Sequence, residues 1–262
     1  MKIISRNVNW IRAVLQKWLL DFVKAENPDI LCLQEVKAFE HQIPTELRFA
    51  MQDYDYVWHR SERPWYAGTA IFYKKNLNIK RSLNLFPDCP ILNDDGRVTA
   101  IERSDFLLLN IYFPNGWDKA DGTKMLSYKL KFYQDYQNFV KEQINQGKKV
   151  ITTGDFNICH HPIDIARPKE NENSIGFLPI ERAEMDKMES IGLIDVFRMQ
   201  NPELTEKYTW WSYRAGARPR NVGWRLDYFR VSENSINQIG PMVHYDQVLG
   251  SDHCPIGLSL QD

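Results

Sequence analysis

The sequence predicts an α/β fold in which short strands alternate with helices. The chain has 262 residues, of which 43% are hydrophobic, so it can bury a full core as one large domain or as two smaller ones. Short β-prone apolar runs recur along it, and segments with helical periodicity lie between them. No Ser/Gly-rich linker, low-complexity tract or charge block divides the chain. We therefore expect residues 1–262 to form a single domain.

The first predicted elements are a strand at residues 3–8 and a helix that follows it directly. The helix is predicted because apolar side chains recur on one face between Ile11 and Val23. A Pro-Asp pair ends it, and residues 30–33 then form a short apolar run that is typical of a buried strand. Glu35 comes shortly after this run, and a carboxylate at the end of a buried strand is a candidate site residue.

The rest of the chain repeats this alternation of strand and helix. A long amphipathic helix is expected at residues 125–146, with Gly147 at its end. Another helix is expected from about Pro179, since proline suits the first turn of a helix. Further strands are predicted where β-prone runs are bounded by turn residues. They are residues 70–73, 98–102, 106–113, 150–153, 208–211, 226–231 and 255–260.

Composition and charge narrow the functional classes. Lys plus Arg (33) nearly cancels Asp plus Glu (34), so any face that binds nucleic acid must be a local patch. The four cysteines are far apart and form no CxxC pair, which favours reduced, buried thiols over a zinc cluster or disulfides. No signal-peptide pattern and no apolar run of about 20 residues is found, so we expect a cytoplasmic monomer without a membrane partner.

Polar residues follow five of the strand-like runs. We call these five groups of residues polar tips, and they are the candidate functional residues. A single carboxylate after a strand is often a helix cap or a solvated turn, whereas five together suggest side chains that converge. Carboxylates, amides and an imidazole without a thiolate cluster favour Mg²⁺ over zinc, with Mn²⁺ as a substitute. The absence of a Gly-x-Ser-x-Gly elbow disfavours a serine nucleophile. The tips are Asn7 with Asn9, Gln34 with Glu35, Asp155 with Asn157, Asp227, and Asp252 with His253.

Six segments, spread over nearly the whole chain, share their residues and their order with the motifs of one enzyme family. They are Ser-Arg-Asn-Val-Asn at 5–9, Leu-Gln-Glu at 33–35, Asn-Ile-Tyr-Phe-Pro-Asn-Gly at 110–116, Gly-Asp-Phe-Asn at 154–157, Asn-Val-Gly-Trp-Arg-Leu-Asp-Tyr at 221–228 and Gly-Ser-Asp-His-Cys-Pro at 250–255. In these segments the chain resembles the exonuclease III family of abasic-site endonucleases. The resemblance implies a four-layered α/β sandwich, in which two mixed β-sheets pack face to face between flanking helices.

The resemblance also implies an activity and a role for each tip. The expected activity is Mg²⁺-dependent hydrolysis of the phosphodiester 5′ to abasic sites in double-stranded DNA. Removal of 3′-blocked ends by 3′→5′ exonuclease action would accompany it, as would incision beside deaminated bases. The implied roles are Glu35 as principal metal ligand with Asn7, Asn9 and Asp252 near the metal, Asp155 on the attacking water, Asn157 and Tyr112 on the phosphate, and His253, supported by Asp227, on a non-bridging oxygen.

Residues 206–230 combine basic and aromatic side chains, which is typical of a surface that grips phosphates and stacks on bases. The alternative is a solvated arginine-rich loop over core aromatics. The resemblance implies that Trp210 and Trp224 line a slot for a flipped abasic sugar, whereas Trp211 is expected in the core. The basic residues are Lys207, Arg214, Arg218, Arg220, Arg225 and Arg230. The DNA contacts expected besides the two tryptophans are Tyr66, Asn115, Arg214 and Arg220.

Three positions depart from the family pattern. Arg6 stands where an aromatic residue is common, Trp10 where glycine is usual, and Trp65 is an unusual neighbour of Tyr66. Because glycine would let the loop bend sharply, an indole at position 10 must cost strain, move the loop or reach toward DNA. Two other functions stay open: a phosphatase of the same fold acting on inositol or other small phosphate esters, and an inactive DNA-binding relic.

Overall fold

The computed structural model describes residues 1–14, 19–118 and 122–261. Two six-stranded sheets form its centre. The first sheet contains β1 (Lys2–Asn7), β2 (Ile30–Gln34), β3 (Tyr54–His59), β4 (Thr69–Lys74), β11 (Ile239–His244) and β12 (Ile256–Leu260). The second contains β5 (Arg81–Leu83), β6 (Val98–Glu102), β7 (Leu107–Tyr112), β8 (Val150–Asp155), β9 (Leu193–Asp195) and β10 (Asp227–Ser232).

Both sheets are mixed and have the same plan. Their strand orders are β11-β12-β1-β2-β4-β3 and β5-β6-β7-β8-β10-β9. In each sheet the two central strands, β1 with β2 and β7 with β8, are parallel, and the other neighbours pair antiparallel. The predicted pair of mixed sheets is therefore confirmed.

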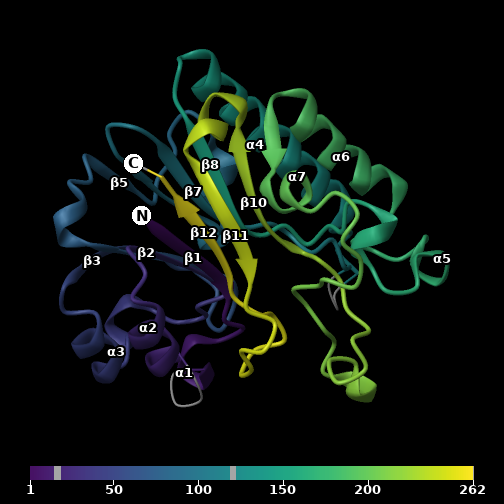
Figure 1. Cartoon of the computed structure of the whole chain (residues 1–262), viewed down its shortest axis with the longest axis horizontal. Coiled ribbons are helices and arrows are strands. Elements are labelled where there is room, and N and C mark those ends of the chain that lie inside the picture. The colour runs from purple at the N-terminus through teal and green to yellow at the C-terminus, as the bar shows by residue number, and fades with distance from the viewer. Residues whose placement is uncertain (15–18, 119–121, 262) are drawn as a thin grey trace.

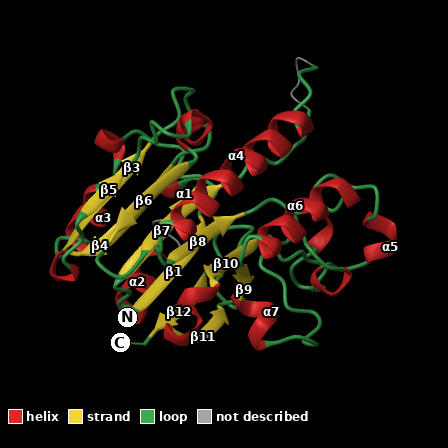
Figure 2. Ribbon diagram, turned by 90° about the horizontal axis from the view of Figure 1, so that it is seen from above, coloured by secondary structure: helices red, strands yellow, loops and turns green. Residues whose placement is uncertain are grey.

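Helices cover the outer faces of the two sheets (Figures 1 and 2). The helices over the first sheet are α1 (Ile11–Val14), α2 (Leu20–Glu26) and α3 (Thr45–Ala50). The long helix α4 (Leu126–Asn145) and α6 (Pro179–Ser190) cover the second sheet. Two short helices, α5 (Pro168–Asn171) and α7 (Val196–Gln200), come before and after α6 along the chain.

The fold has four structural layers: helices, the first sheet, the second sheet and helices. Three apolar layers fill the spaces between them. Successive side chains of a strand point to opposite faces, so Ile4 packs toward the first helical layer while Ile3 packs between the sheets. Ile151 of β8 meets that same inter-sheet layer from the other sheet. Phe132 of α4 belongs to the third layer, between the second sheet and its helices. Since both faces of each sheet are covered, the central strands are buried along almost their whole length.

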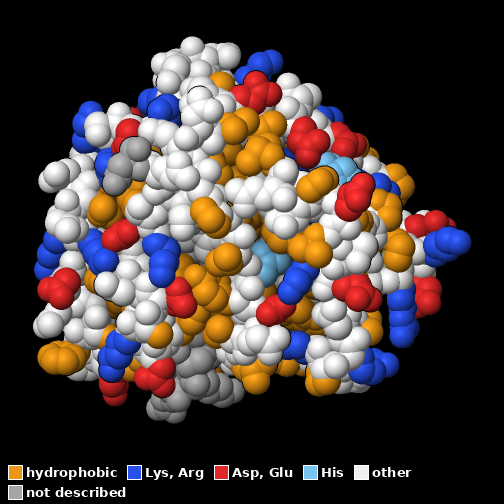
Figure 3. Space-filling view, in the orientation of Figure 1, with side chains coloured by type: hydrophobic (Ala, Val, Ile, Leu, Met, Phe, Trp, Pro, Cys, Tyr) orange, Lys and Arg blue, Asp and Glu red, His pale blue; other side chains and the backbone are white. Residues whose placement is uncertain are grey.

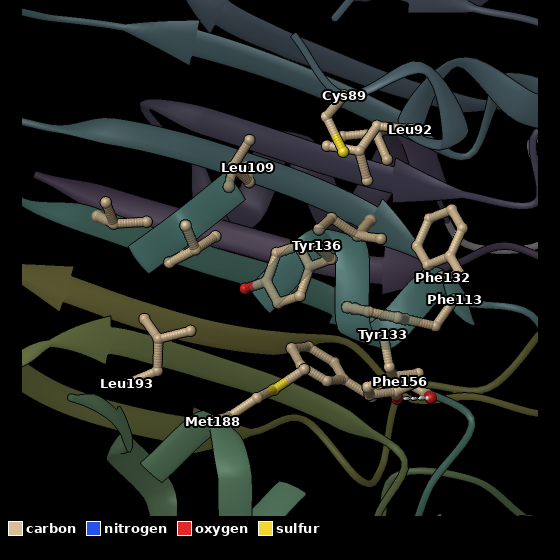
Figure 4. Packing of buried hydrophobic residues seen from close by; sticks show 14 of the residues in the cluster. Cys89, Leu92, Leu109, Phe113, Phe132, Tyr133, Tyr136, Phe156, Met188 and Leu193 are labelled. Carbon is tan, nitrogen blue, oxygen red and sulfur yellow. Dashed lines mark hydrogen bonds between the residues drawn. The ribbon is translucent and has the colours of Figure 1, made fainter. Parts of the chain in front are cut away.

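The third layer also fixes the starts of two loops at the edge of the second sheet (Figure 4). Phe113, directly after β7, packs against Phe156, directly after β8, with ring centroids 4.6 Å apart. Tyr133 of α4 packs against Phe113 with ring centroids 4.4 Å apart, and it donates its hydroxyl hydrogen to the carbonyl of Phe156. These contacts anchor the chain immediately before Asn115 and Asn157.

A buried polar network joins the two sheets beneath the same edge. The Gln34 amide nitrogen donates to Ser5 Oγ at 2.9 Å and to Asn110 Oδ1 of the other sheet at 2.6 Å. The Asn110 amide nitrogen donates back to the carbonyls of Leu33 and Ala70, at 3.1 and 3.0 Å. Because buried polar groups are costly unless they are paired, this network fixes the register of one sheet on the other.

Gly154 is the position where the second sheet has no room for a side chain. A Cβ atom there would lie 1.9 Å from the carbonyl oxygen of Ile111, and φ is +137°. We expect Gly154→Ala to lower the free energy of unfolding by at least about 3 kcal/mol in urea titrations, because backbone atoms must move. Gly147→Ala is the control, since it has φ +83° but nothing within 4 Å, and about 1–2 kcal/mol is expected. Equal losses would contradict the steric explanation.

The structure also corrects and extends the predicted elements. Residues 208–211 do not form a strand; Trp210 makes only isolated bridges, to Trp224 and His253. The strands β3, β5, β9 and β11 were not predicted. Residues 15–18 of the predicted first helix lie outside the described part of the chain. All four cysteines are free and buried, as expected. Within the described residues, no helix combines the length and apolar character needed to cross a membrane.

Candidate active site

The five predicted polar tips meet at one edge of the two sheets. β1 and β2 run parallel and end at Asn7 and Gln34, next to Glu35. β8 ends at Asp155, and its antiparallel neighbour β10 begins at Asp227, directly opposite. The loop before β12 carries Asp252 and His253. In Figure 1 the loops that carry these residues gather at the lower edge of the sheets.

Asn7 connects the carboxylates of the two sheets. Its side-chain nitrogen donates to Glu35 Oε1 and to Asp155 Oδ2, both at 2.9 Å. Its Oδ1 accepts from the backbone N–H of Asn9 at 2.9 Å, and the Asn9 amide nitrogen donates to Asp252 Oδ1 at 3.1 Å. Glu35, Asp155 and Asp252 therefore belong to one continuous network, as the sequence predicted.

His253 lies between two buried aspartates. Its Nδ1 is 2.8 Å from Asp227 Oδ2, and its Nε2 is 3.7 Å from Asp155 Oδ2. Burial alone would lower the pKa of His253, but Asp227 and Asp155 outweigh it and raise that pKa well above its ordinary value. Burial raises the pKa of Asp155, and the nearby Asp227 and Glu35 add to the rise against the opposing charge of His253. The site thus pairs a cationic imidazole with a carboxylate that can accept a proton.

Two further groups face the same point. Asn157 donates its backbone N–H to Asp155 Oδ1 at 2.9 Å and its amide hydrogen to the carbonyl of Phe113 at 2.9 Å. Burial raises the pKa of Tyr112 well above its ordinary value, and Glu35 and Asp155 contribute to the rise. The phenol of Tyr112 therefore keeps its proton and can donate a hydrogen bond to an anion.

Trp210 and Trp224 form an aromatic wall beside Asp252. Their ring centroids are 6.1 Å apart at an interplanar angle of 88°, and both pack on a small apolar cluster that includes Phe177. The indole N–H of Trp210 donates to Asp252 Oδ2 at 3.1 Å. Burial alone would raise the pKa of Asp252, but His253 and the hydrogen bonds from Trp210 and Asn9 outweigh it and lower that pKa. Trp211 is 4% exposed, as predicted.

The donor set around Glu35 fits a hard divalent cation. The Lys37 ammonium lies 2.5 Å from Glu35 Oε2 and 2.7 Å from Asn9 Oδ1, so a cation already sits between these oxygens. Asp155, Asp227 and His253 also lie close enough together to hold a metal ion. His253 is the less suitable ligand, however, because its two ring nitrogens already face Asp227 and Asp155, at 2.8 and 3.7 Å. Glu35, whose carboxylate shares the Asn7 amide with Asp155, is the better centre.

Comparison with known proteins agrees with this geometry. The sequence pattern of the Endonuclease/Exonuclease/phosphatase family matches residues 7–253. The chain belongs to that family. It is 37% identical over 260 residues to an exodeoxyribonuclease of Bacillus subtilis (strain 168), and the match covers 98% of both chains. It is also 37% identical to a DNA-(apurinic or apyrimidinic site) endonuclease of Dictyostelium discoideum, over 98% of this chain and 70% of that protein.

Solved structures of other proteins share the whole fold. An AP endonuclease from Archaeoglobus fulgidus matches with a TM-score of 0.84 and 26% identity, and all of both chains is covered. The 3′ phosphatase NExo from Neisseria, bound to a product DNA hairpin, matches with a TM-score of 0.86 and 27% identity over the same full coverage. Together with the site, these relatives identify the chain as a nuclease of the exonuclease III type.

The basic segment 206–230 differs from the sequence-based expectation for such a nuclease. Arg225 is fully buried and pairs with Asp164 and Asp195 at 2.7 and 2.8 Å. Arg230 is also buried, where it donates to the carbonyl of Leu193. These two arginines stabilise the fold and cannot grip DNA. The prediction was wrong for them because a sequence does not distinguish an internal arginine from a solvated one.

The remaining predicted DNA contacts lie nearer the surface. Arg214 and Arg220 are exposed in the loop after Trp211. Asn115 is exposed, and its Oδ1 accepts from the backbone N–H of Trp117 at 3.1 Å. Tyr66 is half-buried, and its hydroxyl accepts from Arg97 at 2.6 Å. On the face shown in Figure 3, cationic and acidic side chains are interspersed, which agrees with local contacts rather than one large positive field.

Sequence reasoning missed Lys37 and left Arg6 without a role. Lys37 stands two positions after Glu35, and that spacing was the only signal that could have revealed it. Arg6 is buried, and its Nε and Nη2 donate to the carbonyls of His253 and Leu249 at 3.1 and 3.0 Å. Arg218, which was expected on the DNA surface, donates to the carbonyl of Ser251 in the same loop at 2.9 Å. The two arginines therefore hold the loop that carries Asp252 and His253.

Proposed function

We propose that this nuclease hydrolyses the phosphodiester bond 5′ to abasic sites in double-stranded DNA with Mg²⁺ as cofactor. The carrying observation is the continuous network from Glu35 through Asn7 and Asp155 to His253, directly beside the Trp210 and Trp224 wall. The same hydrolysis at the 3′ end of a DNA strand would remove 3′-terminal nucleotides and 3′-blocking groups as a second activity. Incision beside deaminated bases remains a proposal of the same kind.

Asp155 is the residue placed to act on the attacking water. It is buried, it is held by Asn7 and by the backbone of Asn157, and its raised pKa makes it a proton acceptor near neutral pH. Water bonds to phosphorus and passes a proton to Asp155 as the bond from phosphorus to the 3′ oxygen of the preceding nucleotide breaks. That oxygen leaves as a 3′-hydroxyl after it takes up a proton.

His253 is the residue placed to stabilise the charge that grows on the phosphate. Asp227 holds its Nδ1 side, so the Nε2–H points into the site with a positive charge. The protonated Tyr112 phenol is a further hydrogen-bond donor for the phosphate oxygens. The Asn157 amide can join it by exchanging its 3.3 Å hydrogen bond to Asp155 for one to the phosphate. Asn9 and Lys37 position the carboxylates of Glu35 and Asp252.

Glu35, with help from Asp252 and Asp155, would hold the Mg²⁺ ion. When bound, Mg²⁺ supplies Lewis acidity to a phosphate oxygen and lowers the pKa of coordinated water. Oxygen donors without a thiolate support Mg²⁺ or Mn²⁺ rather than a soft metal.

The aromatic wall supports a lesion-specific DNA substrate over a small phosphate ester. Two perpendicular indoles on an apolar cluster suit the apolar face of a deoxyribose that has lost its base. Small inositol phosphates are strongly anionic and would gain little from such a wall. We therefore keep the phosphatase only as the competing outcome of the test.

The test compares cleavage of labelled duplexes that contain one tetrahydrofuran abasic analogue or none. With Mg²⁺ we expect a nick 5′ to the analogue, at least about a hundredfold faster than cleavage of the intact duplex. EDTA should abolish the nick, and added Mn²⁺ should restore it. Release of phosphate from inositol phosphates without any nicking would overturn the proposal in favour of the phosphatase.

A further inference from the structure

Two exposed indoles stand together on the Glu35 side of the active site. Trp10 lies in the loop after β1 and Trp65 in the loop between β3 and β4. Their ring centroids are 5.9 Å apart, and the planes are nearly perpendicular at 87°. The two residues are 39% and 59% exposed, although indoles usually bury most of their surface. The pair is separate from the Trp210 and Trp224 wall, which lies beside Asp252.

The backbone under this pair is strained. Trp10 has a φ of 98° and Trp65 a φ of 60°, in the left-handed region that glycine adopts freely and other residues avoid. Glu35 and Lys37, in the loop between them, also have positive φ, as do Asn9 and Ala67. Strain of this kind concentrates at ligand clamps, where the surrounding structure enforces it. Glycine at positions 10 and 65 would remove it, so the two indoles are placed at a conformational cost.

The strained loops form one rigid unit with a metal-site residue. The backbone N–H of Trp10 donates to the carbonyl of Glu35 at 2.9 Å. The backbone N–H of Lys37 donates to the carbonyl of Ala67, two residues after Trp65, at 3.0 Å. The position of the indole pair is therefore tied to the position of the Glu35 carboxylate. Anything that stacks on the indoles lies at a defined distance from the reacting phosphate.

A small hollow beside Trp65 is lined by three cationic side chains, two of which already pair with carboxylates: Lys37 with Glu35 at 2.5 Å and Arg63 with Asp95 at 2.6 Å. Its volume is about 80 Å³, and it is lined by residues of the 37–42 and 60–68 segments. Among the described residues that line it, Lys37, Arg60 and Arg63 are cationic and none is acidic. A cationic hollow next to an aromatic surface is the combination that binds a phosphate and its base together.

We propose that Trp10 and Trp65 form a stacking platform for a nucleobase next to the scissile phosphate, with the adjoining cationic hollow as the site of that nucleotide's phosphate. The base becomes accessible where the duplex is open, beside an abasic gap or at a frayed 3′ end. This inference rests on the proposed function and adds a binding contact to it. The platform favours opened DNA over intact duplex, because stacked bases offer no free face.

The experiment measures binding in EDTA, so that no DNA is cut. A duplex carrying 2-aminopurine next to an abasic analogue reports affinity by anisotropy and stacking by loss of fluorescence. We expect the double variant Trp10→Gly/Trp65→Gly to bind this duplex about ten- to a hundredfold more weakly and to lose the fluorescence quench. Glycine relieves the backbone strain at both positions, so we expect the variant to remain folded. Its melting temperature checks this.

Two matched variants complete the experiment. Trp10→Phe/Trp65→Phe keeps two aromatic faces and is expected to recover most of the affinity. Phe49→Ala removes an aromatic residue that is 74% exposed on α3, away from the site, and should bind as the wild type does. Equal binding by the folded double glycine variant would overturn the platform even if the wild type nicks abasic DNA. Failure of the wild type to bind or nick abasic DNA would overturn the proposed function as well.

Discussion

Asp155→Asn and His253→Ala are each expected to lower kcat for abasic-site cleavage by about a hundredfold to a thousandfold. An amide at position 155 cannot take the proton from the attacking water, and its NH2 group replaces one of the two oxygens that accept from Asn7 and Asn157. Alanine at position 253 removes the cation that faces the growing negative charge and leaves Asp227 without its partner. Single-turnover cleavage of a duplex with a tetrahydrofuran site measures both effects.

Asp186→Asn is the matched control for these substitutions. Asp186 lies on α6 and accepts from His160 at 2.7 Å, so it forms an Asp–His pair outside the active site. Its loss should leave kcat within about threefold of the wild type, as for a surface substitution. Circular dichroism and melting curves must match the wild type for Asp155→Asn. Normal turnover by either purified active-site variant would remove that residue from the mechanism.

Lys129→Met is expected to lower the free energy of unfolding by about 3–5 kcal/mol. Lys129 and Glu181 are fully buried, and their side chains meet at 2.5 Å between α4 and α6. The Lys129 ammonium also donates to the carbonyls of Asn157 and Asn115, at 2.7 and 3.2 Å. Methionine would leave the Glu181 carboxylate buried without a counter-charge, and two carbonyls of the site loops without a donor. Urea unfolding followed by fluorescence measures the loss.

The control for this pair lies on the same helix. Lys131→Met breaks an exposed ion pair with Asp135 at 2.6 Å and should change stability by less than about 1 kcal/mol. The double variant Lys129→Met/Glu181→Gln should recover part of the loss, because the buried charge is gone. If Lys129→Met is no less stable than Lys131→Met, the buried pair does not stabilise the fold.

The central strands could be predicted from the sequence, whereas the edge strands could not. β1, β2, β7 and β8 are buried on both faces, and each begins with or contains a short apolar run that stands out from the loops. β11 is an edge strand with Gly240 and Pro241 inside it, and these residues locally favour turns. Residues 208–211 are β-prone, but burial of their aromatic rings, rather than a sheet, explains the composition.

Part of the candidate site could be predicted from the sequence, whereas the role of the buried cations around it could not. Polar residues at the ends of apolar strands are visible as breaks in the pattern, and Glu35, Asp155 and His253 were found in this way. Lys129 and Arg225 lie inside the protein, where their partners come from distant segments. The neighbouring residues in the sequence do not distinguish a buried cation from a solvated one. The burial of these two residues depends on partners far away in the chain, and a single sequence does not reveal which residues pair.

The seam between the sheets runs through the reaction centre itself. Asn7, Glu35 and His253 are carried by the sheet of β1 and β12, while Asp155 and Asp227 are carried by the sheet of β8 and β10. Each sheet repeats the same plan of a parallel pair with antiparallel neighbours. Neither sheet by itself therefore carries the full set of catalytic groups. A shift of one sheet against the other would change the Asn7–Asp155 and His253–Asp227 distances together.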